Sequence, residues 1–226
     1  MQAPPPSADV EALLQAALAG DIDRAKAMLH KGAATHAHAK HHESKEHTPS
    51  HHHPHNPHHT HTHLGVGVND ADAEGYTALS CASEKGHVAF VDMLITAGAA
   101  VDHADAVGAT PLYIAAQEGR LDVVKALLKA GATVDQATRD GRTPLLVASE
   151  EGRTEVVKAL IKAKAKVNHA AKEDGATPIY AASMNGHAPV VGTLLDAGAH
   201  SPFRPDDVLW LLAPVHHRPE WRWRRG

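Results

Sequence analysis

The residues of this chain best suited to chemistry are histidines, and most of them lie in one stretch. The sequence has 21 histidines, of which 13 fall within 34–64. Neutral imidazole binds Zn²⁺, Ni²⁺ and Cu²⁺, and an HxH pair in an extended chain presents both rings on one side. The spacing differs from that of structural zinc sites, which place thiolates or histidines at set intervals on a fold. The candidate metal ligands are His51, His52, His53, His55, His59, His61 and His63.

Two other interpretations of this tract stay open. Its composition also fits a solvated linker with almost no large apolar residue to bury. Alternatively, the tract responds to pH, because histidine titrates near pH 6.5 and protonation of these 13 side chains would move the formal charge from −4 to about +9.

No set of residues in the sequence favours catalysis. The single cysteine, Cys81, stands where sibling segments carry Ile114, Val147 and Ala181, so we expect a small buried hydrophobe rather than a nucleophile. Neither GxxxxGK[ST] nor GxGxxG occurs. The EWRWRR segment near the C-terminus could contact phosphates or an acidic surface through arginine and stack through tryptophan; the alternative is a frayed end. We therefore predict that the protein is not an enzyme.

Composition excludes several classes of protein. One cysteine allows no internal disulfide, which favours a reducing compartment. No apolar run approaches the roughly 18 residues of a membrane span, and the opening MQAPPPSADVEA lacks the features of a secretory signal. With a net charge of −4, we expect no nucleic-acid partner. We expect a monomer in the cytoplasm, with the nucleus as an alternative.

The elements that must position any site are repeats with a period of 33 or 34 residues. Their matching threonines are Thr77, Thr110, Thr143 and Thr177, and their matching glycines are Gly86, Gly119, Gly152 and Gly186. A fixed period of this size predicts a stacked array of helical units rather than a globule around a pocket.

Each repeat predicts two helices. Threonine caps the first helix, and after Thr110, Thr143 and Thr177 a proline follows at its first position. The inter-helix glycine ends it in a left-handed conformation. The second helix should bury a stripe such as Val124, Leu127 and Leu128. It should end at Gly98, Gly131 or Gly198, whereas the third repeat has Lys164 there and one extra residue in the loop that follows.

The chain divides into five segments on this basis. We predict a disordered N-terminus over 1–8, a degenerate capping repeat over 9–33, a disordered His-rich insertion over 34–64, four repeats over 65–200, and over 201–226 a C-terminal cap helix with a basic Trp/Arg tail.

The repeats resemble the ankyrin family. The segment TPLYIAAQEGRLDVVKALLKAGATVD, residues 110–135, carries the family's Thr-Pro-Leu, Ala-Ala, Gly, Val-Val, Leu-Leu and Gly-Ala pattern, with Tyr113 in place of a histidine. Ser80, Leu146 and Tyr180 replace that histidine in the other repeats. The resemblance implies an all-α solenoid of stacked helix-turn-helix units with β-hairpin loops, interrupted here by the His-rich insertion.

The resemblance also implies that another protein binds the concave face, made by hairpin tips and first helices. Carried over by position, the partner-binding candidates are Glu74, Tyr76, Glu84, Lys85, Gln117, Glu118, Arg139, Arg142, Glu150, Glu151, Glu173, Asp174, Met184 and Asn185. This face is mostly acidic, with one basic tip at Arg139 and Arg142; ordinary solvated helix ends are the alternative interpretation.

The function that follows is a non-enzymatic scaffold or adaptor that needs no cofactor. Two alternatives stay open. One is a metal-buffering or metal-sensing protein whose His-rich tract takes Zn, Ni or Cu and whose repeats only support it. The other is a regulatory fragment of a longer protein.

Overall fold

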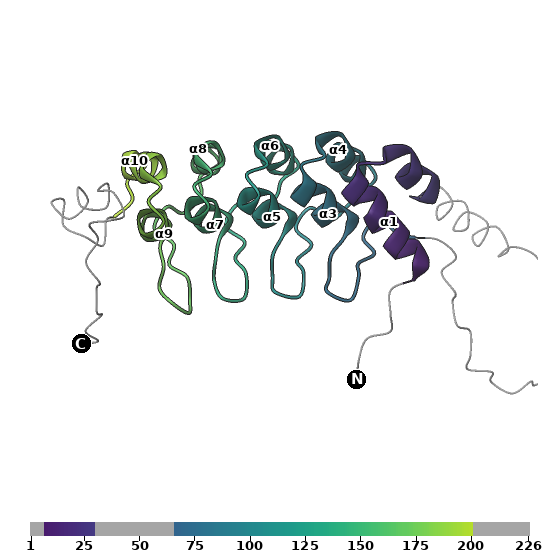
Figure 1. The fold of residues 1–226 in the computed structure, drawn as a ribbon, viewed down its shortest axis with the longest axis horizontal. Helices are drawn as coiled ribbons and strands as arrows, with labels where there is room; N and C mark the ends of the chain where they lie inside the picture. Colours follow the sequence, from purple (N-terminus) through teal and green to yellow (C-terminus); the bar gives the residue numbers. More distant parts are fainter. Residues whose placement is uncertain (1–6, 30–65, 201–226) are drawn as a thin grey trace, which may run out of the picture.

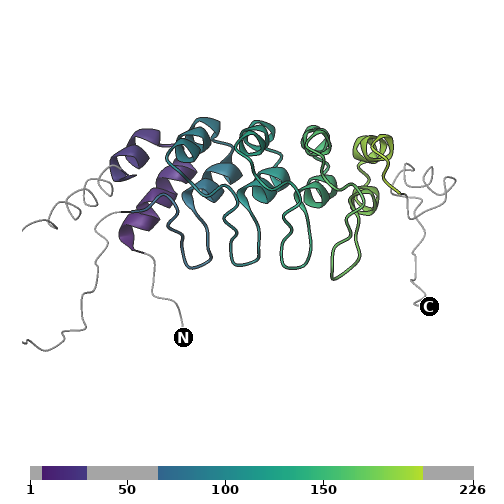
Figure 2. The same cartoon turned by 180° about the vertical axis from the view of Figure 1, so that it is seen from behind.

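The computed structural model describes residues 7–29 and 66–200. Within these ranges the chain forms an elongated stack of antiparallel helix pairs (Figures 1 and 2). The helices are α1 (Ala8–Ala19), a helix over 22–29, α3 (Ala78–Lys85), α4 (Val88–Thr96), α5 (Pro111–Gln117), α6 (Leu121–Lys129), α7 (Pro144–Glu150), α8 (Thr154–Lys162), α9 (Pro178–Met184) and α10 (Ala188–Asp196). The predicted all-α repeat architecture is confirmed.

The first helix of each repeat begins at the predicted threonine cap. The Oγ1 atoms of Thr77, Thr110 and Thr143 accept hydrogen bonds from main-chain N–H groups three residues later, at 3.2–3.3 Å. Thr177 does the same at 3.4 Å. Because the first N–H groups of a helix have no partner within it, this acceptor fixes where each helix starts.

The glycines between the paired helices adopt the predicted left-handed conformation, with φ between 69° and 84° at Gly86, Gly119, Gly152 and Gly186. This turn reverses the chain, so that the second helix of each repeat packs back along the first. In Figure 1 the second helices α4, α6, α8 and α10 form one row, and α3, α5, α7 and α9 form the row beside it.

The buried stripe of the second helices differs by one position from the prediction. Val123, Val124 and Leu127 are the buried residues of α6, whereas Leu128 is only partly buried. The shift recurs at Ile95 and Ile161, which are partly exposed, and at Leu195, which is exposed. The two adjacent valines both face the core because the helix is covered by its own repeat and by both neighbours, which widens its apolar side.

Small residues determine how closely the first helices approach. Ala82, Ala115, Ala148 and Ala182 occupy equivalent positions and are fully buried. Neighbouring first helices lie in closer contact along the stack than neighbouring second helices do. Since one row is packed more tightly than the other, the stack bends toward the row of first helices, and the hairpin loops project from that row (Figure 1).

Successive repeats are joined by hydrogen bonds that recur with the same period. The side-chain Oδ1 atoms of Asn69, Asp102, Asp135 and Asn168 accept from the main-chain N–H of a residue in the next repeat, at 2.7–3.0 Å. The hairpins are linked as well: Ala106 N–H donates to Glu74 O, and Lys172 N–H donates to Asp140 O, both at 2.8 Å. These bonds tie neighbouring loops in repeats that lack the family's histidine.

The third repeat ends irregularly, as the sequence predicts. Lys164 has φ 70°, the only positive φ of a non-glycine residue in the described part of the chain. The hairpin that follows closes between Ala171 N–H and Ala176 O. Its siblings close between residues four apart, as from Asp105 N–H to Ala109 O. The additional residue therefore widens the tip of this hairpin.

At the N-terminal end, α1 packs against α3. Ser7 caps α1 by accepting from the Val10 N–H, and Val10, Leu13 and Leu14 are buried. These apolar side chains cover the face of the first full repeat that would otherwise meet water, which is what a capping repeat must do.

Candidate functional site

The surface with the features of a binding site is made by the hairpin loops and the first helices. We call it the inner face; it comprises the loops over 71–77, 105–110, 138–143 and 171–177 and helices α3, α5, α7 and α9 with their C-cap residues. The predicted partner-binding residues lie on two parts of it. Six are in the hairpin loops, and the others stand at the C-terminal ends of the first helices.

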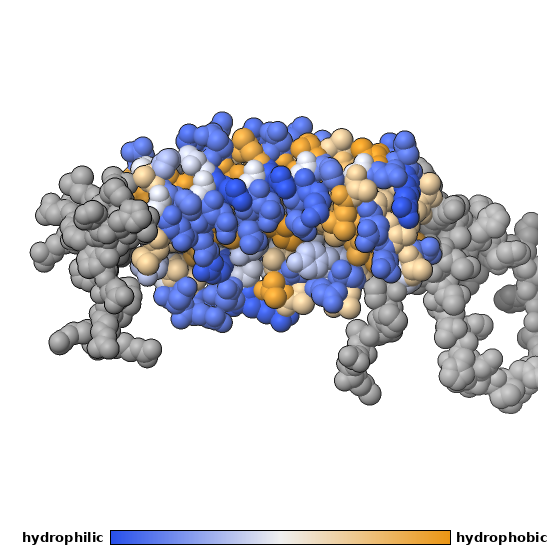
Figure 3. All heavy atoms as spheres, viewed as in Figure 1, coloured by the Kyte–Doolittle hydropathy of each residue, from blue (hydrophilic) through white to orange (hydrophobic). Residues whose placement is uncertain are grey.

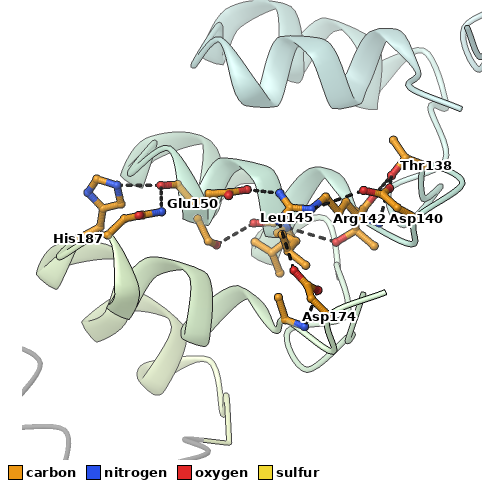
Figure 4. Close-up of polar contacts among 12 residues, drawn as sticks. Thr138, Asp140, Arg142, Leu145, Glu150, Asp174 and His187 are labelled. Carbon is orange, nitrogen blue, oxygen red and sulfur yellow. Dashed lines mark hydrogen bonds and ion pairs between the residues drawn. The ribbon is translucent and has the colours of Figure 1, made fainter. Parts of the chain in front are cut away.

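Arg142 brings together residues of two repeats on this face. Its guanidinium donates a hydrogen bond to Glu150 Oε2. It lies 3.6 Å from Asp140 Oδ2 and 3.7 Å from Asp174 Oδ2, the latter in the next repeat. Figure 4 shows Arg142 among these carboxylates. The predicted basic tip at Arg142 is therefore an internal crosslink, with its charge matched by neighbours rather than offered to a partner.

Burial of Arg142 and its acidic neighbours act in opposite directions on its pKa. Desolvation lowers the pKa of the guanidinium. The hydrogen bond to Glu150 and the charges of Glu150 and Asp174 raise this pKa, and together they outweigh desolvation, so the net shift is upward. The side chain is 25% exposed. The group stays cationic; its pair with Glu150 holds the side chain within its own repeat, and its approach to Asp174 links that repeat to the next.

Two tyrosines lie beside these charges. Burial raises the pKa of Tyr113, with Arg142 opposing the shift and Asp140 and Glu150 adding to it. The pKa of Tyr76 is also raised by burial, and then by Asp105 and Glu84. Both rings are half-buried. The inner face thus places partly exposed aromatic rings next to carboxylates, an arrangement that suits the stem and charge of lysine or arginine.

Several carboxylates on the inner face have no cation of their own. Within the described ranges, no ion pair involves Glu74, Glu118, Glu151 or Glu173, all of which are exposed. Glu118 is the C-cap of α5, and Glu151 is the C-cap of α7. The C-terminus of a helix carries partial negative charge. A carboxylate at that end therefore destabilises the helix, whereas a lysine would stabilise it. Folding alone does not account for this choice of residue.

The other predicted residues are distributed around these groups. Lys85 pairs with Glu84 at 2.6 Å, and this hydrogen bond raises the pKa of Lys85. Asn185 Nδ2 donates to Glu150 O at 3.0 Å, so it serves the junction between repeats. Met184 is 52% exposed, and Val107, which the sequence analysis did not select, is 61% exposed at a hairpin tip. Figure 3 shows mainly hydrophilic residues over the visible face, with small separate hydrophobic areas.

One set of periodic residues was missed by the sequence analysis. The residue before each second helix sends its side chain to a main-chain carbonyl of the preceding repeat: His87 to Leu18 O, Arg120 to Glu84 O, Arg153 to Gln117 O and His187 to Glu150 O, at 2.8–3.1 Å. Figure 4 shows the bond from His187. The sequence did contain a signal for these bonds: a histidine or an arginine, whose side-chain nitrogen can donate, recurs at this position with the repeat period.

Cys81 is buried at 6% exposure, as predicted from its equivalents. Burial, followed by the charges of Asp72 and Glu84, raises the pKa of its thiol to about 11. At neutral pH the thiol is protonated and shielded, which is opposite to what a nucleophile requires.

The predicted metal ligands over 51–63 lie outside the described residues, as do the predicted cap helix and the Trp/Arg tail. In the part that the structure describes, no cluster of three or more His, Cys, Asp or Glu residues is arranged to hold a metal ion. None of the helices in that part is long and apolar enough to cross a membrane.

The fold and this surface together define a helical repeat protein with an extended inner face. The family model of ankyrin repeats in three copies matches residues 13–138 and 131–202. The chain therefore belongs to the ankyrin-repeat family, whose members typically serve as protein-interaction scaffolds and are usually not catalytic. No curated protein matches the chain.

Proposed function

We propose that this protein is a non-enzymatic scaffold or adaptor that binds a partner protein on its inner face. The observation that carries the proposal is the set of unpaired carboxylates, above all Glu118 and Glu151 at the C-terminal ends of α5 and α7. Both positions oppose the helix macrodipole at a cost of about 0.3–1 kcal/mol each. Residues that break a local stability rule are expected mainly where function requires them.

The charge of the face favours a partner segment that carries lysine or arginine. Such a segment would gain charge-assisted hydrogen bonds from carboxylates that hold no cation in the free protein. It would also contact the partly exposed rings of Tyr76 and Tyr113. Because those rings are already packed, little side-chain entropy would be lost on binding.

The test is capture of a partner by the full chain as bait, compared with two double variants of equal charge change. Glu118→Lys with Glu151→Lys alters the inner face. Asp122→Lys with Glu155→Lys alters α6 and α8, on exposed positions of the second row. We expect several-fold weaker capture by the first variant and unchanged capture by the second. Equal effects of the two would show that binding does not use the inner face.

A second candidate function rests on the 13 histidines within 34–64. If the protein buffers or senses metal, Zn²⁺ or Ni²⁺ should bind with defined stoichiometry at sub-micromolar concentration and change its affinity for the captured partner. Titration of the full chain and of a chain lacking 34–64 separates the two functions. Weak binding of variable stoichiometry, without effect on the partner, would leave the scaffold function alone.

A further inference from the structure

The inner face matches a segment of the same chain in charge and in side-chain type. Residues 218–225 read RPEWRWRR, with four arginines, two tryptophans and a single carboxylate. This segment lies outside the described residues and follows the last repeat. Its arginines can form paired hydrogen bonds with carboxylates, and its tryptophans can cover apolar surface.

The inner face carries the complementary charge. Its carboxylates outnumber its cations. The carboxylates are those of Asp72, Glu74, Glu84, Asp105, Glu118, Asp140, Glu150, Glu151, Glu173 and Asp174, and the cations are Lys85, Arg139, Arg142 and Lys172. Two of those cations are already engaged, Lys85 with Glu84 and Arg142 with Glu150. The face also exposes Val107 and Met184, which lie in a hairpin tip and at the end of α9.

We propose that the Trp/Arg segment 218–225 docks on the inner face of its own chain, over the carboxylates at Glu118, Glu151 and Glu173. This inference rests on the inner face being the binding surface proposed above, and it identifies the occupant of that surface when no partner is present. A partner would then have to displace the segment, which makes the contact autoinhibitory.

The length of the connecting chain permits this docking. Residue 200 is the last one described, and Trp221 follows 21 residues later. If 208–213 forms the predicted cap helix on the last repeat, residues 214–225 still span about 40 Å when extended. Neighbouring helices lie about 8–10 Å apart, so the chain can extend over α9, α7 and α5, whose repeats carry Glu173, Glu151 and Glu118. Such a short tether gives an effective concentration on the order of millimolar, enough to hold a weak contact.

The contact can be measured with the tryptophans of the chain itself. All three, Trp210, Trp221 and Trp223, lie in the segment 201–226. A Trp210→Phe chain therefore reports only on the docking segment. We expect its fluorescence to be quenched by acrylamide several-fold less than that of a free peptide of residues 214–226. Raising the salt to about 0.5 M should remove most of this protection, because the contact depends on exposed charges.

Matched variants in the Trp210→Phe chain test where the segment docks. Glu118→Lys, Glu151→Lys and Glu173→Lys together should abolish the protection. The control, Asp92→Lys, Asp122→Lys and Glu155→Lys, makes the same charge change on exposed positions of α4, α6 and α8 and should retain it. Arg222→Ala, Arg224→Ala and Arg225→Ala together test the segment while leaving the repeats intact, and they should also abolish it.

Three results would overturn the inference. Quenching equal to that of the free peptide would show that nothing covers the tryptophans. Equal loss in inner-face and control variants would indicate a general charge effect. Protection that grows with protein concentration would identify a second copy as the occupant.

The docking and the scaffold function can fail separately. If docking fails but Glu118→Lys with Glu151→Lys still weakens partner capture, the scaffold function stands. If docking holds but partner capture is insensitive to these two substitutions, the scaffold function fails.

Discussion

Arg142 shows how one side chain alters the charge that the inner face presents. Its equivalents in the neighbouring repeats are Ala109 and Ala176, which cannot pair with anything. By binding Glu150 in its own repeat and lying near Asp174 in the next, it neutralises part of the face and joins two repeats. The sequence predicted only a basic tip, because Arg142 precedes the cap of α7 and lies outside that helix, so its pairing with Glu150 depends on how the hairpin folds back.

The thiol of Cys81 provides a prediction at the scale of a residue. Its pKa is about 11 in the folded protein against an ordinary value of 9.0. The raised folded-state pKa means that its contribution to stability is fully present below pH 9 and is lost as pH rises from about 9 to 11. We expect Cys81→Ala to lose less stability than the wild type across this window.

The measurement is the denaturation midpoint at pH 8 and pH 10 for both proteins. The pKa values of Tyr76 and Tyr113 are raised as well, so both proteins lose some stability at high pH, and only their difference reports the thiol. At pH 8 a thiol reagent should also modify the native protein far more slowly than the unfolded chain. Rapid native modification would contradict the burial of Cys81.

At the scale of elements, glycines with a left-handed backbone can meet two separate requirements, one of conformation and one of space. Gly141 has φ 87°, and a Cβ atom there would lie 2.7 Å from the main-chain N of Lys172 in the next repeat. Gly131 has φ 91° but open space around that position. Of these two glycines, only Gly141 is therefore needed for close approach between repeats as well as for its backbone conformation.

We predict that Gly141→Ala destabilises the protein more than Gly131→Ala does. Both changes force an L-residue into the left-handed region, at about 1–2 kcal/mol. Gly141→Ala adds a clash with backbone, on the order of 1–3 kcal/mol. Equilibrium unfolding in urea measures both. Equal losses would mean that the neighbouring hairpin moves away at little cost.

The junction after the third repeat should be the most dynamic in the array. Lys164 occupies the left-handed position where siblings have glycine, and the next hairpin is one residue longer. We expect faster amide hydrogen exchange over 162–176 than over 96–109 or 129–142. Lys164→Gly should slow that exchange and stabilise the protein by about 1 kcal/mol. Equal protection at the three junctions would show that packing of the fourth repeat outweighs the defect.

Most elements could be predicted from the sequence because the same pattern of residues occurs in four repeats. The Thr caps, the inter-helix glycines and the conformation of Lys164 all followed from positions equivalent under the period. What could not be predicted depends on contacts between repeats. Leu128 was placed in the core by helical spacing, yet Val123 is buried instead, since a second helix is covered from three sides. The approach of Arg142 to Asp174 is likewise a contact between repeats.

At the scale of the whole molecule, the hydrophobic core of the described array runs along its length, from Val10 to Ala199, rather than around one centre. Its free energy of unfolding is a sum of repeat terms and nearest-neighbour contacts. The recurring bonds from Asn69, Asp102, Asp135 and Asn168 and the bonds of His87, Arg120, Arg153 and His187 belong to the second kind. The proposed binding surface crosses the same junctions, so we expect changes there to affect both stability and binding.

The same reasoning makes a prediction about residues 34–64. They interrupt the chain between the capping repeat and the first full repeat, at a junction where α1 packs on α3 and His87 bonds to Leu18 O. These contacts form between the flanking helices themselves, and loop-closure entropy grows only with the logarithm of loop length. Deleting 34–64 should therefore change the free energy of unfolding by less than about 1 kcal/mol, which corresponds to a shift in Tm of roughly 2–4 °C or less.

Thermal unfolding followed by circular dichroism, without added metal, measures the Tm of the full chain and of the deletion variant. A drop in Tm well beyond that range would show that the His-rich tract packs on the repeats, and the interpretation of the tract as a solvated linker would have to be abandoned.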